Sequence, residues 1–205
     1  MANQVAPTKN NLMAAKKSLK LARMGYDLLG RKKNILVREI MDRMQEASGI
    51  QEKVEQAYAE AYEALQKAHL FMGACMDYAR SVPLDDSMQL VVHSVMGVEL
   101  PVITMDEEQK TDLYYGIGDT SSQLDDAYLA FDRVKRLTVR LAEIESNVLR
   151  LAEAISKTQK RTNALNNIMI PRLSENIKFI SDALDEKDRE DFSRLKVIKS
   201  SKEEQ

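Results

Sequence analysis

The sequence predicts an all-α protein, a long antiparallel two-helix coiled coil with a small central head that contains a β-hairpin. Proline spacing is the first observation: Pro7 and Pro83 bracket one uninterrupted helical pattern, and a second pattern that begins near Ser121 contains only Pro171. Composition is the second: 30% of the residues are charged, 5% are aromatic and Trp is absent, which is typical of coiled coils and long helices. We expect an N-terminal arm at 1–82, a head at 83–120 and a C-terminal arm at 121–205.

The first arm is predicted to be one helix from Thr8 to about Arg80. Thr8 is a suitable N-cap, because its hydroxyl can accept a hydrogen bond from an unpaired N–H group of the first turn. Pro83 ends the pattern, since the residue before a proline avoids the helical conformation. Apolar residues recur in steps of three and four, which indicates a coiled-coil seam. They include Leu12, Leu19, Leu29, Leu36, Ile40, Val54, Ala57, Ala61, Ala68 and Phe71.

Four glycines interrupt this arm, and each weakens a helix by about 1 kcal/mol relative to Ala. We expect them to mark points of close approach or bending. They are Gly25, Gly30, Gly49 and Gly73.

The middle of the chain has a different pattern. The stretch from Met88 to Ile103 is rich in β-branched residues, which predicts a small β-hairpin that turns between His93 and Gly97. Pro101 has no N–H to donate to a ladder of backbone hydrogen bonds. Its strand must therefore lie at a sheet edge, or Pro101 must stand at the end of the strand. An acidic loop or short helix is expected from Asp106 to Gly118.

The second arm is predicted to begin at Ser121 or Ser122, where Asp125 and Asp126 suit the positive end of the helix dipole. Pro171 should kink the helix or break one turn of it. The seam residues are Leu124, Phe131, Val134, Leu137, Leu141, Ile144, Val148, Leu151, Ile155, Thr162, Leu165, Ile168, Leu173, Ile177, Ile180 and Leu184.

The two arms have nearly equal lengths and one connection, which predicts that they pair antiparallel. A fold-back without slip places Phe71 beside Phe131, and a shift by one heptad would also match apolar residues with apolar residues. The same fold-back places Ala61 beside Leu141, Val54 beside Val148, and Lys32 and Lys33 near Arg172.

Charge is distributed unevenly. Residues 1–40 carry nine Lys or Arg against two acids, residues 81–130 carry ten acids against one Lys, and residues 131–172 carry nine basic residues against four acids. A basic stripe can bind nucleic acid or an acidic protein surface. A solvated helix face is the simpler interpretation of such a run.

No catalytic constellation is visible. His69 and His93 are not paired at ligand spacing, and Gly116-Ile117-Gly118 lacks the remaining residues of a phosphate-binding loop. Cys75, the single cysteine, is expected in the core and favours a reducing compartment. The N-terminus lacks the apolar stretch of a signal peptide, and the longest uncharged run, Ser87–Val98, is too short to span a membrane. We therefore expect no catalytic residue, cofactor, metal site or direct membrane insertion.

Three segments carry more specific motifs. The first contains Pro7-Thr8, Gly25, Leu28-Leu29 and Lys32-Lys33, and the second is Val95-Met96-Gly97-Val98 followed by Pro101. The third contains Thr162-Asn163-Ala164-Leu165, Ile170-Pro171-Arg172-Leu173, Leu184-Asp185-Glu186 and Phe192 with Arg194-Leu195-Lys196. In this order and spacing, over nearly the whole chain, the sequence resembles the D subunit of the V-type and A-type rotary ATPases.

The resemblance implies a non-catalytic central-stalk rotor that couples ATP hydrolysis or synthesis in a ring of catalytic and regulatory subunits to ion translocation through a membrane rotor. Both termini would enter the ring, and the hairpin end would point toward the membrane rotor. The implied partners are the ring subunits, the F subunit and the lower-stalk component that links to the membrane rotor ring, with no nucleic acid. The implied location is cytoplasmic, peripheral to the membrane.

Two groups of residues are the expected contact sites. A basic belt would face the acidic interior of the ring, and the hairpin would engage the F subunit or the lower stalk. The belt consists of Lys32, Lys33, Arg38, Arg161 and Arg172, and the hairpin residues are Val95, Met96, Gly97 and Val98.

The main alternative is a generic antiparallel coiled-coil scaffold or tether. A membrane-curving helical module is disfavoured by the acidic middle of the chain. Co-purification distinguishes these interpretations, because a scaffold would not bring down the catalytic subunits of an ATPase.

Overall fold

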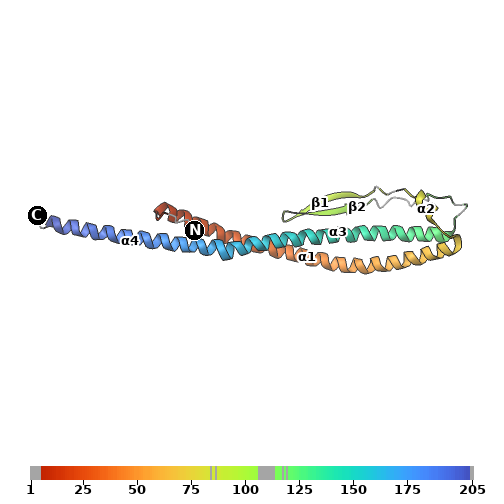
Figure 1. The fold of residues 1–205 in the computed structure, drawn as a ribbon, viewed down its shortest axis with the longest axis horizontal. Coiled ribbons are helices and arrows are strands. Elements are labelled where there is room, and N and C mark those ends of the chain that lie inside the picture. The colour runs from red at the N-terminus through yellow and green to blue at the C-terminus, as the bar shows by residue number, and fades with distance from the viewer. Residues whose placement is uncertain are drawn as a thin grey trace. The chain divides into compact units, whose positions relative to one another are not determined.

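The computed structural model describes residues 6–83, 85, 87–105, 114–116, 118 and 120–203, with residues 201–203 in backbone only. Its helices and two-stranded sheet confirm the predicted class, an all-α coiled coil with a small β-hairpin (Figure 1). The elements are α1 (Lys9–Met72), α2 (Met76–Ser81), β1 (Gln89–Val95), β2 (Val98–Thr104), α3 (Ser122–Ala164), the π-helix η2 (Leu165–Met169) and α4 (Ile170–Glu203).

The chain forms two compact units, and α1 contributes to both. One unit comprises Ile35–Ile155, and the other combines Met1–Asn34 with Ser156–Gln205. The division into two arms and a head at 83–120 stays a prediction. No helix in the described part of the chain combines the length and the apolar character that crossing a membrane requires.

The predicted cap of α1 is confirmed, but its predicted end is wrong. The Asn11 N–H donates to Thr8 Oγ1 over 3.2 Å, so Thr8 closes the first turn. The helix ends at Met72 because Gly73 has a φ of +77°, a left-handed conformation that terminates helices. The helical pattern up to Arg80 resumes only as the short α2.

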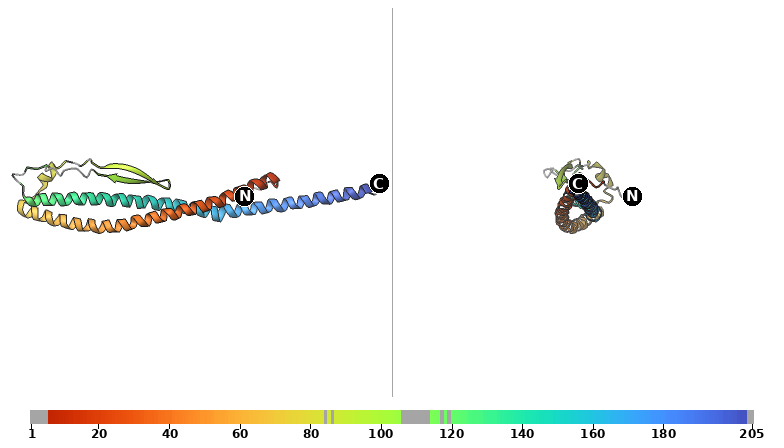
Figure 2. Two further views of the ribbon diagram at one scale, coloured as in Figure 1. Left: turned by 180° about the vertical axis from the view of Figure 1, so that it is seen from behind. Right: turned by 90° about the vertical axis from the view of Figure 1, so that its left-hand side faces the viewer.

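In the unit Ile35–Ile155, α1 and α3 lie antiparallel and bury small apolar clusters between them (Figure 2). Each fully buried Leu or Val side chain contributes about 1.5–3 kcal/mol to folding. The clusters are Leu36 with Leu100 and Leu151, Ala57 with Ala61 and Val134, and Ala68 with Cys75 and Leu124. The expected core position of Cys75 is thus confirmed.

The predicted register of this pair is wrong by about one heptad. Phe131 contacts Tyr62, whereas its predicted neighbour Phe71 is 72% exposed. The fold-back assumed a first helix that runs to Arg80. The real end at Met72 lies beside the start of α3, where the Ser121 N–H is 3.3 Å from Met72 Sδ. Helix ends, rather than overall arm lengths, therefore set the register.

The hairpin turns where the sequence predicts. Met96 and Gly97 have φ values of 51° and 73°, and they join a register in which Val95 pairs with Val98. Two positive φ values are the signature of a type I′ turn, which matches the twist of the flanking strands. Pro101 lies opposite Val92 in a two-stranded sheet, where each strand is an edge. The loop expected from Asp106 to Gly118 falls largely outside the described residues.

In the other unit, Pro171 is accommodated by a π-turn, which is the predicted one-turn break. The Ile170 N–H donates to the carbonyl oxygen of Leu165, five residues earlier. The seam therefore steps by five residues from Leu165 to Ile170 before it continues through Leu173 to the buried Ile180. Ile168, predicted in the seam, is 62% exposed because the extra residue turns it outward.

Candidate partner interfaces

The hairpin is seated on the helices through one face of β2. Leu100 is buried between Leu36 of α1 and Leu151 of α3, and Val95 and Val98 pack against the same cluster. The four hairpin residues expected to contact a partner thus separate into two kinds. Val95 and Val98 are half-buried and hold the hairpin down, whereas Met96 and Gly97 form its exposed tip.

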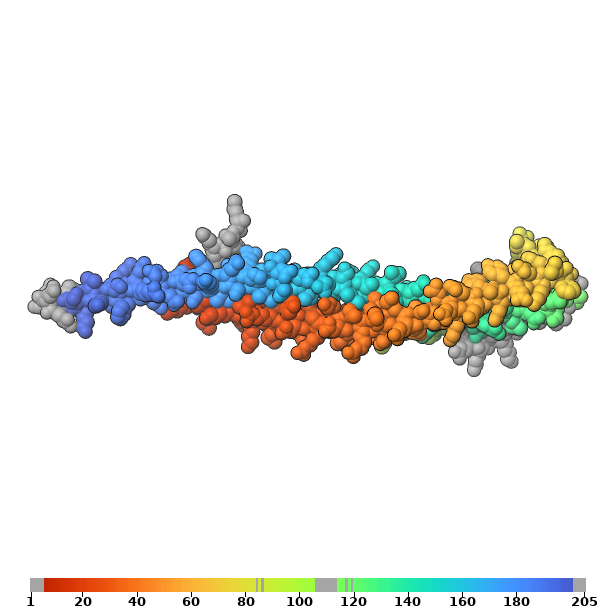
Figure 3. Space-filling view, turned by 90° about the horizontal axis from the view of Figure 1, so that it is seen from below, coloured from red at the N-terminus to blue at the C-terminus, as the bar shows by residue number. Residues whose placement is uncertain are grey.

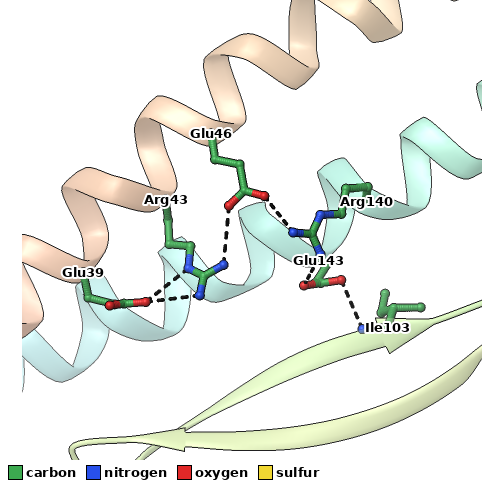
Figure 4. Close-up of polar contacts among 6 residues, drawn as sticks. All are labelled: Glu39, Arg43, Glu46, Ile103, Arg140 and Glu143. Carbon is green, nitrogen blue, oxygen red and sulfur yellow. Dashed lines mark hydrogen bonds and ion pairs between the residues drawn. The ribbon is translucent and has the colours of Figure 1, made fainter.

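A polar cluster continues this seat (Figure 4). The carboxylate of Glu143, a side chain only 2% exposed, accepts from the Ile103 N–H over 3.1 Å and from Arg140 Nη1 over 3.0 Å. Arg140 also binds Glu46 of α1, with 2.7 Å between Nη2 and Oε1. This second contact raises the pKa of the Arg140 guanidinium. One carboxylate therefore joins β2, α3 and, through Arg140, α1.

The cluster extends along α1 through residues that are more exposed. Arg43 contacts Glu46 over 3.4 Å and Glu39 over 3.2 Å. Ion pairs of this exposure are worth about 0–1 kcal/mol each. The buried end at Glu143, rather than this chain of surface pairs, is the energetically important part.

The strand β1 lies on the outer side of the hairpin. Leu90, Val91 and Val92 are 66%, 54% and 53% exposed. Three consecutive apolar side chains on an exposed edge strand are unusual, because such an edge can pair with another chain. Successive side chains of a strand point to opposite faces, so Leu90 and Val92 expose apolar surface on one face of β1 and Val91 on the other. Exposed apolar surface of this kind is often covered by a protein partner.

The structure places the basic belt in both units. Lys32 and Lys33 are half-buried on α1, and Arg161 and Arg172 are exposed in the same unit, whereas Arg38 is exposed in the unit Ile35–Ile155. Among the described residues, none of the five forms an ion pair.

The expected neighbourhood of Lys32 and Arg172 is wrong. A Cβ on Gly25 would lie 3.8 Å from Leu165 Cδ1, so the segment of α3 before Leu165 faces Lys32 in this antiparallel pair. That segment brings Arg161, and not Arg172, to the neighbourhood of Lys32.

The last turns of α4 extend beyond the first turns of α1 within their unit (Figure 3). Phe192, Leu195 and Val197 are each about two-thirds exposed there. This end of α4 therefore carries large apolar side chains that are exposed to solvent.

An apolar pocket of about 280 Å³ lies beside α2, lined by Cys75, Tyr78, Leu124 and Phe131 among others. Tyr115 also lines it and donates to Asp125 Oδ1 over 2.7 Å. Burial is the larger cause and this hydrogen bond the smaller cause of a raised pKa for Tyr115, which keeps its hydroxyl protonated. The described residues contain no group of three His, Cys, Asp or Glu side chains placed to bind a metal ion.

Sequence reasoning missed Glu143 and Arg150. Arg150 Nη1 donates to the Glu99 carbonyl oxygen over 3.0 Å, so it too holds β2. Both belong to a second stripe on α3, beside the seam, that recurs in steps of three and four. This polar stripe, with Asn147 buried in the middle of it, was the signal in the sequence that could have indicated a second packed face of α3.

Comparison with known proteins adds a family match over almost the whole chain. The profile of the family of ATP synthase D subunits matches residues 11–200. The D subunit of the V-type ATP synthase of Thermotoga neapolitana is 45% identical over 95% of this chain and 97% of its own length. The D subunits of the A-type ATP synthases of Thermococcus sibiricus and Methanobrevibacter smithii are 38% and 37% identical, over 96% of this chain and 94% and 87% of their own lengths.

Proposed function

Because the chain belongs to the family of ATP synthase D subunits, we propose that it is the central rotor shaft of a V/A-type ATPase. As a D subunit it is a component of that complex and not an enzyme by itself. The proposed role is to couple ATP hydrolysis or synthesis in the catalytic ring to ion translocation through the membrane rotor.

The observation that carries this proposal is the antiparallel helix pairing in each unit, together with the family match. A shaft must transmit torque without bending freely, which favours long helices that support each other over a single helix. The 64 residues of α1 alone span roughly 100 Å at 1.5 Å per residue. Contacts that slide against a ring also favour charged and adaptable surfaces over one deep apolar lock.

We assign the two termini to the ring and the hairpin end to the lower stalk. The exposed apolar end of α4 and the basic belt support the first assignment, because both are surfaces that a surrounding partner would cover. Residues 81–130 carry ten acids against one Lys, and this charge difference supports a different partner for that part of the sequence. The F subunit is proposed to engage the hairpin, and the lower-stalk component to engage the acidic end. The chain would lie on the cytoplasmic side, peripheral to the membrane.

Co-purification and reconstitution test the proposal. The tagged chain should bring down catalytic and regulatory ATPase subunits from its native source. An ATPase assembled without it should hydrolyse ATP without pumping ions, and the added chain should restore ATP-driven transport into vesicles. Isolation without ATPase subunits, or transport that is independent of the chain, would support a generic coiled-coil scaffold instead.

A further inference from the structure

The two edges of the hairpin differ in their backbone hydrogen bonding. Val95 and Val98 close the two-residue turn, so they exchange backbone hydrogen bonds. Pairs in an antiparallel ladder alternate between exchanging these bonds and directing them outward. On β2, Glu99, Pro101 and Ile103 therefore direct their backbone groups away from β1.

At each of these outward positions on β2, a backbone group that a further strand would need is either absent or already hydrogen-bonded. Pro101 has no N–H to offer. The Ile103 N–H is taken by Glu143 over 3.1 Å, and the Glu99 carbonyl oxygen is taken by Arg150 over 3.0 Å. Side chains of α3 thus occupy the place that a third strand would have, and the docked edge of the hairpin is β2.

Glu143 is the central member of this arrangement. It is 2% exposed, so its charge must be balanced within the protein. Arg140 balances the charge over 3.0 Å and is itself held by Glu46 of α1 over 2.7 Å. The carboxylate therefore has a fixed position, and the Ile103 N–H is fixed with it.

We propose that Glu143 is a positioning residue, which locks β2 onto α3 and thereby fixes β1 as the strand presented to the F subunit. The proposal rests on the proposed function in one respect, that the F subunit engages the hairpin. Leu100 supplies the attraction between hairpin and helices, but an apolar contact tolerates sliding. The Glu143 carboxylate fixes the position of β2 along α3, because its hydrogen bond to the Ile103 N–H forms in one register only.

Amide hydrogen exchange on the full chain tests the lock directly. In Glu143→Ala the Ile103 N–H loses its acceptor, and amide exchange in β1 and β2 should rise by about 5- to 150-fold, the range that corresponds to the cost of an unpaired buried donor. Amides of α1 and α3 should keep their protection. In Glu143→Gln the amide oxygen can still accept from Ile103, so hairpin exchange should lie between Glu143→Ala and wild type. Glu145→Ala, the same change at an exposed position on α3, should match wild type.

The second readout is ATP-driven ion transport by the reconstituted complex. Transport should fall in Glu143→Ala, recover in part in Glu143→Gln and remain normal in Glu145→Ala. Unchanged hairpin exchange in Glu143→Ala would overturn the lock. Increased exchange with normal transport would overturn the presentation of β1 to a partner. Failure of the proposed function is separate, since the wild-type chain itself would then not restore transport.

Discussion

The ring of Phe131 on α3 meets the ring of Tyr62 on α1 edge to face, with 5.7 Å between the ring centroids and 89° between their planes. Aromatic rings prefer this geometry, because the positive edge of one faces the negative face of the other. The pair records the register of the two helices in the unit Ile35–Ile155, and Phe71 has no part in it.

A double-mutant cycle on Tyr62→Ala and Phe131→Ala should give a coupling energy of about 0.5–1 kcal/mol, because the two rings lose one shared contact. The measurement is the free energy of unfolding in guanidinium chloride. The matching cycle with Phe71→Ala and Phe131→Ala should give no coupling. The reverse result would restore the register in which Phe71 opposes Phe131.

Two glycines of the first arm should respond oppositely to alanine. Gly49→Ala should stabilise the chain by up to about 1 kcal/mol, because the position is helical and a Cβ there meets nothing within 4 Å. Gly73→Ala should destabilise it by about 1–2 kcal/mol, since the φ of +77° strains any residue with a Cβ. Thermal unfolding monitored by circular dichroism measures both. Stabilisation by Gly73→Ala would mean that α1 continues past Met72.

Asp85 should stay ionised in acid below the usual range of a carboxyl group. Lys135 Nζ lies 2.7 Å from Asp85 Oδ2, and this hydrogen bond, with a further one from the Ser87 N–H, lowers the pKa of Asp85. In Lys135→Met the pKa of Asp85 should rise toward 3.8. A carbon-13 titration of the carboxyl group measures the change, and an unaltered titration midpoint would show that Lys135 does not hold Asp85.

The same pair predicts a pH dependence of stability. A carboxyl group with a lowered pKa stabilises the folded chain above its unfolded-state pKa of about 3.9, and this contribution is lost as the pH falls from there through the folded-state pKa. Asp85→Asn should therefore destabilise the chain at pH 7, by less than about 1 kcal/mol for a partly exposed pair, and have no effect in strong acid.

Charge reversal in the basic belt tests its proposed contact with the ring. Lys32→Glu with Lys33→Glu should leave the helix content nearly unchanged and reduce ATP-driven transport in reconstituted vesicles. The reduction should be largest at low ionic strength, because salt screens attraction between charged surfaces. The control, Lys53→Glu with Arg80→Glu, changes the charge equally at exposed positions outside the belt. Equal effects of both double variants would identify the belt as an ordinary solvated face.

The features that the sequence predicted correctly are encoded within a few neighbouring residues. Thr8 caps the helix that follows it, Met96-Gly97 forms the turn between its own two strands, and Pro171 disturbs the turn before it. Each depends on local backbone chemistry, so one sequence suffices to find it.

The features that sequence reasoning missed depend on contacts between distant segments. The register follows from the place where Gly73 ends α1, and helical periodicity alone cannot distinguish positions one heptad apart. Glu143 looks like any helical glutamate until the hairpin folds back and brings the Ile103 N–H to it. The place where the hairpin packs on the helices therefore depends on contacts between distant segments, which the local sequence pattern does not contain.

The π-turn at Leu165–Met169 makes the C-terminal arm sensitive to its own length. Each residue of an α-helix turns its side chain by about 100° relative to the one before, and the five-residue step from Leu165 to Ile170 absorbs one extra residue of this rotation. Deleting one residue inside this turn would convert the five-residue step into an ordinary four-residue step, so Leu173, Ile177 and Ile180 would stay in the seam. The same deletion would remove the turn that accommodates Pro171, whose ring clashes with the carbonyl of a regular α-helix. Deleting one residue earlier in α3 would keep the turn and instead rotate every later side chain by about 100° relative to α1. A shorter arm is therefore compatible with the seam at the π-turn and opposed there by Pro171, whereas elsewhere it displaces the seam itself.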